Sequence, residues 1–331
     1  MEQAHDTIRA LALLSGGLDS ILAACVVREQ GIDVVGISFE SPFFDAARAR
    51  TAAAQIELPL RVIDFTAVIA AILEQPKHGF GSCMNPCIDC HAAMIRKAGE
   101  ILTAEGFHFI VTGEVLQQRP MSQNRRSLDV VATDSGVADL LLRPLSARLL
   151  PETEPERRGW VDRSKLHAIS GRTRKAQFEL AARFGIRDYV AGAGGCRLTE
   201  PNFSARLREL QGHEGVRDAR ALRLLRFGRH FRLGDTVKLV VGRDQDDNAL
   251  VESAAGPGDF VLKSESVPGP TGWLASGADE GQIQLAAAIC ARYSDSKPGV
   301  PVTVDIRGAG GGRRLEAVPA AREAAEARRI G

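Results

Sequence analysis

The residues with the clearest chemical potential lie at positions 15–20, which read SGGLDS. They follow an apolar run at 8–14 and open a helical pattern that begins at Asp19. Glycines let the backbone approach a ligand closely, and free N–H groups at a helix start attract anionic oxygens. Serine hydroxyls add donors, and an aspartate can hold a magnesium ion or a ribose hydroxyl. The pattern predicts a phosphate-binding loop made by Ser15, Gly16, Gly17, Asp19 and Ser20.

Cysteines form the second group of reactive residues. The chain has six, and in a reducing compartment they are better interpreted as core thiols, ligands or nucleophiles than as disulfides. Cys87 and Cys90 form a CxxC pair at the start of a helical pattern, where the helix terminus favours the thiolate form. Cys196 follows a glycine-rich stretch at 191–195 and could reach the same place. The other three cysteines are expected in the apolar core or in a loop: Cys25, Cys290 and Cys83.

Three kinds of chemistry fit the thiols. A 4Fe-4S cluster held by Cys87, Cys90 and Cys196 would leave one iron without a protein ligand, and that position could carry sulfur. A tetrahedral zinc site would use Cys83, Cys87 and Cys90, with either Cys196 or His91 as the fourth ligand. In a metal-free mechanism, one cysteine would become a persulfide and another would resolve it. The three-cysteine cluster is the favoured hypothesis.

Strand-like runs alternate with helical patterns over the first half of the chain. The strands are expected at 8–14, 34–39, 60–65, 107–112 and 140–144, and the helices at 19–30, 43–56, 68–74 and 90–105. This alternation is typical of right-handed crossovers and predicts an α/β fold with a doubly wound parallel sheet. Ligands bind outside the carboxyl ends of such strands. Four further residues there are expected to bind the nucleotide: Ser38, Thr112, Gly113 and Glu114.

The second half of the chain differs in character. Helices are expected at 163–170, 174–184 and 280–293, and alternating or strand-like segments at 236–242, 249–253, 259–264 and 300–306. Arginine recurs at every third position from Arg217 to Arg232, which could follow an RNA backbone or be the exposed face of a linker helix. We expect three parts: a catalytic domain at 1–212, a small α+β domain at 213–306, and a flexible or helical tail at 307–331.

Composition limits the possible partners. The net charge of +1 over 331 residues gives no overall attraction to nucleic acid, so any basic patch must be local. The sequence has no apolar run long enough for a membrane span, and acidic residues near its start argue against a signal peptide. The expected location is the cytoplasm, with no membrane contact.

Several motifs resemble those of known families. SGGLDS at 15–20 resembles the PP-loop signature SGGxDS of ATP pyrophosphatases, and NPCIDC at 85–90 resembles the NPCxxC loop of tRNA 2-thiouridylases. Residues 112–123 are similar to the TGExxxQxxSQ stretch of 4-thiouridine synthetases, and the RPL at 143–145 is similar to the RPL that follows it. The region 231–306 resembles the RNA-binding domain of NFACT proteins.

The resemblance implies an ATP-dependent tRNA sulfurtransferase that adenylates a uridine carbonyl, releases pyrophosphate and AMP, and replaces the oxygen with sulfur. It implies catalytic roles for Asp19, Cys87, Cys90 and Cys196, with ATP, Mg²⁺ and a 4Fe-4S cluster as cofactors. Further contacts to phosphate or RNA are expected from Gln118, Arg119 and Arg143. The expected partners are tRNA, a sulfide or persulfide donor, and a second copy in a homodimer. Two alternatives stay open: another PP-loop adenylating ligase with structural zinc, and a non-catalytic RNA-binding protein.

Overall fold

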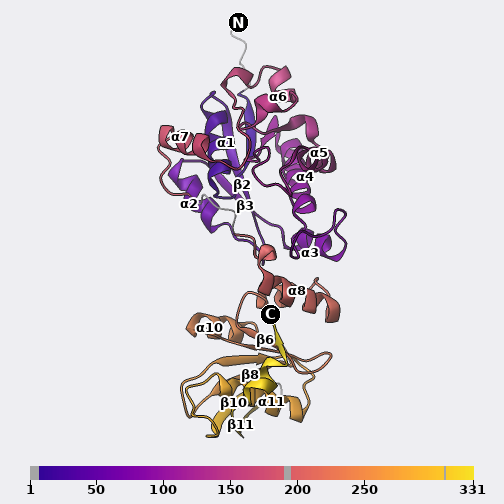
Figure 1. Ribbon diagram of the computed structural model, residues 1–331, viewed down its shortest axis with the longest axis vertical. Helices are drawn as coiled ribbons and strands as arrows, with labels where there is room; N and C mark the ends of the chain where they lie inside the picture. The colour runs from indigo at the N-terminus through magenta and orange to yellow at the C-terminus, as the bar shows by residue number, and fades with distance from the viewer. Residues whose placement is uncertain (1–6, 190–194, 309–310) are drawn as a thin grey trace. The chain divides into compact units, whose positions relative to one another are not determined.

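The computed structural model describes residues 7–189, 195–308 and 311–331 (Figure 1). Its internal contacts divide the chain into two units, residues 1–196 and residues 197–331. This division falls earlier than the predicted boundary at 212, because helix α8 (Pro201–His213) belongs to the second unit. There Glu209 of α8 forms ion pairs with Arg232 and Lys238.

The first unit is built on a five-stranded parallel sheet with the order β3-β2-β1-β4-β5. Its strands are β1 (Arg9–Leu13), β2 (Asp33–Glu40), β3 (Leu60–Asp64), β4 (Phe109–Val111) and β5 (Leu141–Leu142). The chain runs outward from β1 to β3 and then returns to place β4 beside β1. The loops after β1 and β4 therefore diverge at the switch point of the sheet, where a ligand crevice forms. The predicted α/β class is confirmed.

Helices cover this sheet. They are α1 (Leu18–Arg28), α2 (Ala47–Gln55), α3 (Thr66–Glu74), α4 (Cys87–Glu105), α5 (Arg125–Ser135), the one-turn α6 (Glu154–Arg157) and α7 (Lys175–Arg183). Helix α1 packs with α7 and α4 with α5, and the two pairs lie on opposite sides of the strands in Figure 1. The sequence did not reveal α5. The helix predicted at 163–170 was wrong: only 163–165 form a short 3₁₀ turn, and Ser170 bridges to Leu116.

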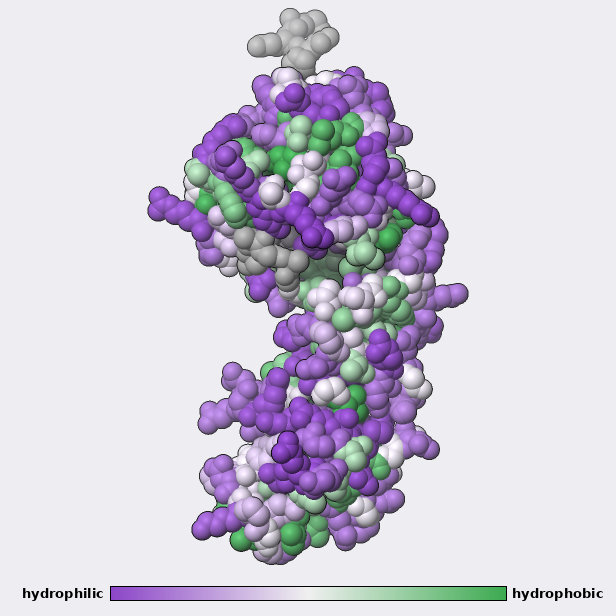
Figure 2. Space-filling view, in the orientation of Figure 1, coloured by the Kyte–Doolittle hydropathy of each residue, from purple (hydrophilic) through white to green (hydrophobic). Residues whose placement is uncertain are grey.

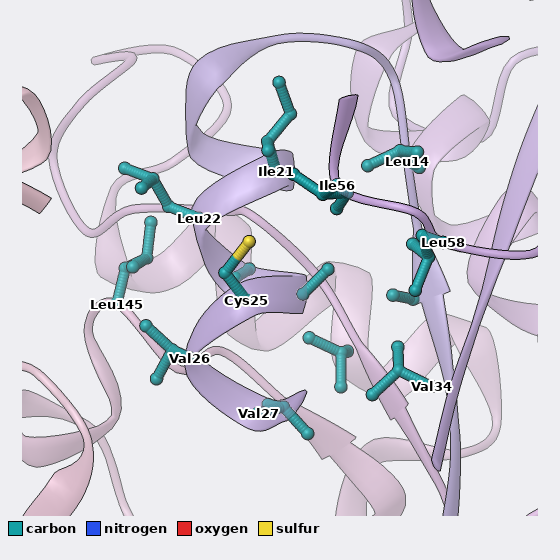
Figure 3. Close-up of a cluster of buried hydrophobic side chains, with 14 of the residues drawn as sticks. Leu14, Ile21, Leu22, Cys25, Val26, Val27, Val34, Ile56, Leu58 and Leu145 are labelled. Carbon is teal, nitrogen blue, oxygen red and sulfur yellow. The ribbon is translucent and has the colours of Figure 1, made fainter. Parts of the chain in front are cut away.

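Helix α1 is the central packing element of the first unit. Nine of its eleven residues are buried, and they pack against neighbours such as Leu58 and Leu145 (Figure 3). Cys25 lies within this cluster and its exposed fraction is 7%, so the predicted core position is confirmed. Because α1 is anchored on nearly all sides, its first turn is a rigid platform for the loop before it.

The second unit contains a seven-stranded antiparallel sheet with the order β11-β10-β8-β9-β7-β6-β12. Its strands are β6 (Arg229–Arg232), β7 (Lys238–Val241), β8 (Phe260–Ser264), β9 (Thr271–Leu274), β10 (Val302–Gly308), β11 (Gly311–Ala317) and β12 (Arg329–Ile330). Its other helices are α9 (Ala219–Leu224), α10 (Gln245–Ser253), α11 (Glu280–Arg292) and α12 (Arg322–Glu326). The main core lies between α11 and the sheet and includes the fully buried Cys290. This arrangement confirms the predicted α+β class.

Two local predictions in the second unit were wrong. The segment 249–253 is the end of helix α10 and not a strand, because Asp244 caps a helix that begins at Gln245. The expected flexible or helical tail contains β11, which pairs with β10 over its whole length, as well as α12 and β12. Glycine and arginine at 311–314 suggested a flexible or frayed segment, but these residues pair with β10 as part of β11.

The surface of both units is mainly hydrophilic on the face that Figure 2 shows, with scattered apolar residues. Within the described residues, no helix combines the length and apolar character needed to cross a membrane.

Candidate active site

The loop after β1 is held in shape by its own hydroxyls. Ser20 Oγ donates to the carbonyl of Gly17 at 2.8 Å, and the hydroxyls of Ser15 and Ser20 lie 3.3 Å apart. Gly16 has a φ of +77°, and a Cβ there would lie 2.4 Å from the backbone of Arg48 in α2. Only glycine fits this position, which brings the loop against α2 and points it along the start of α1.

The loop after β4 packs directly on the first turn of α1. A Cβ on Gly113 would lie 2.5 Å from both Cα and N of Ser20. Glycine at 113 therefore lets the backbones of the two loops touch. This contact brings Thr112, Gly113 and Glu114 beside residues 15–20, as expected for loops on either side of a switch point. Ser38 is buried near the carboxyl end of β2, and its role in nucleotide binding stays a prediction.

Asp19 is partly buried among polar side chains. Burial raises the pKa of its carboxyl group above the usual value, while the charge of Arg174, a hydrogen bond from Gln177 and the charge of Arg119 act in the opposite direction. The Arg174 Nη2 atom lies 3.3 Å from Asp19 Oδ2, and both side chains are 17% exposed. Asp19 is thus an anion held in place by a cation, which suits a group that exchanges that cation for Mg²⁺.

Arg174 and Gln177 are site residues that sequence analysis missed. They stand at the N-terminal end of α7, more than 150 residues after Asp19 in the chain. In the amide orientation that satisfies both of its groups, Gln118 accepts from Arg174 Nε at 2.7 Å and donates to the Gly171 carbonyl at 3.0 Å. Gln177 is fully buried beside Gln118, with their amides 3.1 Å apart. The network joins α7 to the loops after β1 and β4.

Glu114 is the centre of a buried ion-pair network. Burial alone would raise its pKa, but the charge of Arg143 and hydrogen bonds from His91 and Arg143 lower the pKa to about 2. Arg143 Nε donates to Glu114 Oε2 at 2.8 Å, and Thr112 Oγ1 lies 3.3 Å from the same oxygen. Arg143 also donates to the Leu128 carbonyl at 3.1 Å. Arg143 is therefore engaged inside the unit, and the structure contradicts the idea that it contacts phosphate or RNA.

The cysteine loop is joined to this network. His91 Nδ1 lies 3.3 Å from Glu114 Oε1, and His91 directly follows Cys90 in the first turns of α4. Before α4, Asn85 accepts a hydrogen bond from the Cys83 N–H at 3.1 Å and donates to Cys87 Sγ at 3.2 Å. Asn85 therefore fixes the loop and the Cys87 sulfur together.

Cys90 lies within electrostatic reach of both other predicted cysteines. It is buried, and its pKa is raised well above the usual value by that burial and then by Cys196 and Cys87. Residues 191–194 of the preceding glycine stretch lie outside the described residues. That all three thiols form one site stays a prediction. Cys83 is half-buried in the loop.

Ligand spacing distinguishes the metal hypotheses. Across residues 7–189, 195–308 and 311–331, three ligand atoms all within 4.8 Å of one another occur only in His78, Asp89 and Asp134. At least two of the three cysteine sulfurs therefore lie farther apart than the ~3.8 Å that zinc–sulfur bonds of ~2.3 Å impose in a tetrahedron.

The cluster of His78, Asp89 and Asp134 connects the cysteine loop to α5. His78 donates its backbone N–H to Asp89 at 3.1 Å, and its ring lies 2.7 Å from Asp134. Lys77 binds both oxygens of Asp134, at 2.8 and 2.9 Å. Both carboxylates are therefore already paired. We interpret the cluster as a set of contacts that fixes the loop before α4 to α5.

Comparisons with known proteins agree with this geometry. Residues 6–148 match the family model for the thiamine biosynthesis protein ThiI, and residues 228–328 match the NFACT protein RNA binding domain. Residues 6–148 of the first unit are thus similar to a PP-loop domain of the ThiI type, and residues 228–328 of the second unit are similar to the RNA binding domain of NFACT proteins. The predicted resemblances are confirmed at the level of the domains.

Individual relatives are similar to the first unit. A tRNA sulfurtransferase of Desulfurococcus amylolyticus is 29% identical over 148 residues, 41% of this chain and 29% of the relative. The tRNA-specific 2-thiouridylase MnmA of Frankia casuarinae is 33% identical over 147 residues, 37% and 40%. This chain thus spans less than half the length of either. A solved 4-thiouridine synthetase with RNA and ATP aligns at TM-score 0.40 and 20% identity, covering 65% of this chain and 52% of that one.

Proposed function

We propose that the chain is an ATP-dependent tRNA sulfurtransferase. The observation that carries the proposal is the link between two groups of residues: the loop at 15–20 with its carboxylate, and the helix turn that carries Cys90. The network of Glu114, Thr112 and His91 links them, because it joins the loop after β4 to the helix turn that carries Cys90. A reaction that activates a carbonyl and then delivers sulfur needs both sites within reach of one nucleotide.

Adenylation is assigned to the loop after β1. The uridine oxygen attacks the α-phosphorus of ATP, pyrophosphate leaves, and the oxygen becomes part of a good leaving group. Ser15, Gly16, Gly17 and Ser20 bind the pyrophosphate oxygens through N–H and hydroxyl donors. Asp19 holds Mg²⁺, while Arg174, released from Asp19, neutralises charge on the phosphates.

Sulfur delivery is assigned to Cys87, Cys90 and Cys196. A sulfur nucleophile then attacks the activated carbon. The carbon–oxygen bond breaks, and AMP leaves carrying the former uridine oxygen. We favour a 4Fe-4S cluster over a single zinc ion, because at least two of the three sulfurs lie farther apart than ligands of one zinc ion would. Such a cluster, when bound, would supply an iron without a protein ligand at which sulfur can be held. A persulfide on one of the same cysteines is the metal-free alternative.

The remaining parts of the proposal concern partners. The NFACT-type domain is the expected site of general RNA binding, with tRNA in the cytoplasm as the substrate. Sulfide or a persulfide carrier is the donor, and the working form is a homodimer. Mass measurement in solution and donor replacement would test these two points independently of the chemistry.

The central experiment combines AMP formation with nucleoside analysis. Anaerobically purified protein is incubated with ATP, Mg²⁺, sulfide and tRNA that lacks thiouridine. We expect AMP formation that depends on tRNA, together with thiouridine in the digested product. Asp19→Ala should abolish AMP formation, whereas Cys87→Ala, Cys90→Ala and Cys196→Ala should abolish thiolation and leave ATP binding intact.

Cys83→Ala is the matched control, because Cys83 lies in the same loop and is given no chemical role. It should retain thiolation. Full activity of Cys196→Ala would contradict the three-cysteine assignment, and AMP formation by Asp19→Ala would contradict the phosphate-binding assignment. Iron and acid-labile sulfide near a 4Fe-4S stoichiometry would support the cluster. A colourless protein with stoichiometric zinc would favour an adenylating ligase, and the absence of RNA-dependent AMP formation would favour a non-catalytic RNA-binding protein.

A further inference from the structure

We propose that the segments 117–123 and 170–175 of the first unit together form a docking surface for the RNA strand beside the target nucleotide. The proposal rests on the proposed function, since it places the RNA at the adenylation site. It adds a second RNA contact that does not involve the NFACT-type domain. The two segments are called the cationic surface below.

The two segments are joined to each other by the backbone. Leu116 and Ser170 form a parallel β-bridge, and the Gly171 N–H donates to the Leu116 carbonyl at 2.8 Å. Gln117 N–H donates to the Gln123 carbonyl at 2.7 Å, which closes the first segment into a compact loop. The cationic surface is therefore one piece of structure, although more than forty residues separate its halves in the sequence.

The cationic surface borders the predicted ATP site. Arg174 contacts Asp19 directly, and the charge of Arg119 acts on the Asp19 carboxyl group. An RNA strand held here would have its neighbouring nucleotide next to residues 15–20, where the pyrophosphate of ATP is proposed to lie.

Its charge has one sign. Residues 117–123 (QQRPMSQ) and 170–175 (SGRTRK) contain four cations and no acidic residue. Arg119, Arg172 and Lys175 are exposed, and none of their side chains has a hydrogen bond or ion pair to another described residue. Three solvated cations grouped beside an active-site loop are available for phosphate oxygens without breaking an internal pair.

An apolar side chain lies among these cations. Met121 is 82% exposed, the highest value among the large hydrophobic residues exposed in the described part of the chain. Its backbone carbonyl accepts from Ser127 Oγ at 3.1 Å, so the loop that presents it is tied to α5. An exposed thioether within a cationic patch suits an unpaired base, which offers a flat apolar face next to its phosphate.

RNA fits this combination better than a protein partner does. A protein ligand for three exposed cations would need matching carboxylates but would give Met121 no particular partner, whereas a single-stranded nucleotide supplies both groups in one unit. The surface is also small, as expected for a few nucleotides held at an active site. An acidic sulfur-carrier protein is the competing occupant that the experiment must separate.

The test measures RNA binding by the full-length chain in the absence of ATP and sulfur donor. Fluorescently labelled tRNA and a short labelled oligouridine are titrated at several salt concentrations. For the triple variant Arg119→Gln, Arg172→Gln and Lys175→Gln we expect weaker binding by about tenfold or more. We also expect the slope of log affinity against log salt to shrink by about two, at ~0.7 per lost phosphate contact on a single strand. Met121→Ala should weaken binding without changing the slope.

Arg187→Gln is the matched control. Arg187 is an exposed arginine of the same unit, but it lies beside Gln55 at the end of α2 that is remote from Arg48. It should bind RNA like the unaltered chain. Wild-type affinity and salt slope in the triple variant would overturn the proposal. The same would follow if the triple variant bound RNA normally and had lost binding only to an acidic persulfide carrier. The binding test measures no turnover. If thiolation failed, the proposed function would be contradicted, but the RNA-binding result could still be interpreted.

Discussion

Two arginine-rich regions of this chain use their charge in opposite ways. Between residues 217 and 232 of the second unit, Arg220 pairs with Asp259, and Arg232 pairs with Glu209 and Glu214. In the cationic surface of the first unit, Arg119, Arg172 and Lys175 are exposed, and their side chains form no hydrogen bond or ion pair with another described residue. The sequence shows both regions as basic, but only the structure shows which charges are still available to a ligand.

The difference has an energetic consequence. A cation that is paired with a buried carboxylate cannot be removed without leaving that carboxylate uncompensated, so its loss costs stability. A solvated cation can be removed at little cost in stability, so its loss is seen only in binding. Several of the arginines at 217–232, which could have followed an RNA backbone, are therefore engaged inside the second unit. Variants at the paired arginines of 217–232 should therefore lose stability, whereas variants of the exposed cations in the cationic surface should lose binding only.

The largest effect is expected at Asp259, which is 5% exposed. Its carboxylate accepts hydrogen bonds from Arg220, from Trp273 Nε1 at 3.0 Å, and from the backbone N–H groups of Gly256 at 2.8 Å and Ser276 at 3.0 Å. Asp259→Ala should lower the free energy of unfolding of the second unit by about 3–5 kcal/mol, because several donors lose their buried acceptor. Chemical denaturation measures this.

Arg223→Ala is the control for that variant. Arg223 is an exposed residue of α9 within the same arginine-rich segment. Its replacement should change stability by less than about 0.5 kcal/mol. Equal losses in the two variants would remove the distinction between engaged and available arginines.

Glu114 tests the same distinction inside the first unit through pH. Its pKa is lowered to about 2 in the folded state, so the ionised form stabilises the fold at pH values above the unfolded pKa of about 4.5. That stabilisation, about 3 kcal/mol in total, should decline as the pH falls from about 4.5 towards about 2. Unfolding of the wild type and of Glu114→Gln, compared at pH 6 and pH 3, should converge. A difference between them that is independent of pH would contradict the network described here.

Much of the fold could be predicted because its signals are local. Apolar runs and helical periods gave the five parallel strands and the helices between them, within a few residues. Helix α5 was missed because its polar sequence is fixed by the Asn124 cap, which accepts from Ser127 N–H at 2.9 Å, and by packing on α4. Strand β11 was missed because its order comes from pairing with β10.

The candidate site divides in the same way. The spacing of residues 15–20 and of the CxxC pair identifies both in the sequence. Gly113 follows a strand, and the fold brings it beside residues 15–20 as predicted. Arg174 and Gln177 gave no signal, because an arginine and a glutamine at a helix start are ordinary until the fold brings them to Asp19. Arg143 was assigned to a ligand because sequence cannot show that Glu114 already pairs with it.

Arg174 stands between the two classes of arginine, since it is paired yet borders the cationic surface. Arg174→Ala should reduce AMP formation about a hundredfold, the usual cost of losing one group that stabilises developing charge. Stability should also fall, by about 1–3 kcal/mol, because Asp19 and Gln118 lose their donor and are largely buried. Arg174→Lys, which keeps the charge but not the planar donor set, should recover part of the rate. A variant with normal turnover would assign Arg174 to structure alone.

The smallest effect is expected at Asn85, whose one side chain both orders the loop and contacts a reactive sulfur. Its oxygen orders the loop through the Cys83 N–H, and its nitrogen donates to the Cys87 sulfur. Asn85→Ala should lose about 1 kcal/mol of local protection, seen as about fivefold faster hydrogen exchange at Cys83. Asn85→Asp keeps the acceptor and should preserve that protection, yet it should slow alkylation of Cys87 in metal-free protein, because a nearby carboxylate disfavours thiolate. If Asn85→Asp loosened the loop as much as Asn85→Ala, the ordering of the loop and the contact to sulfur could not be assigned to separate atoms.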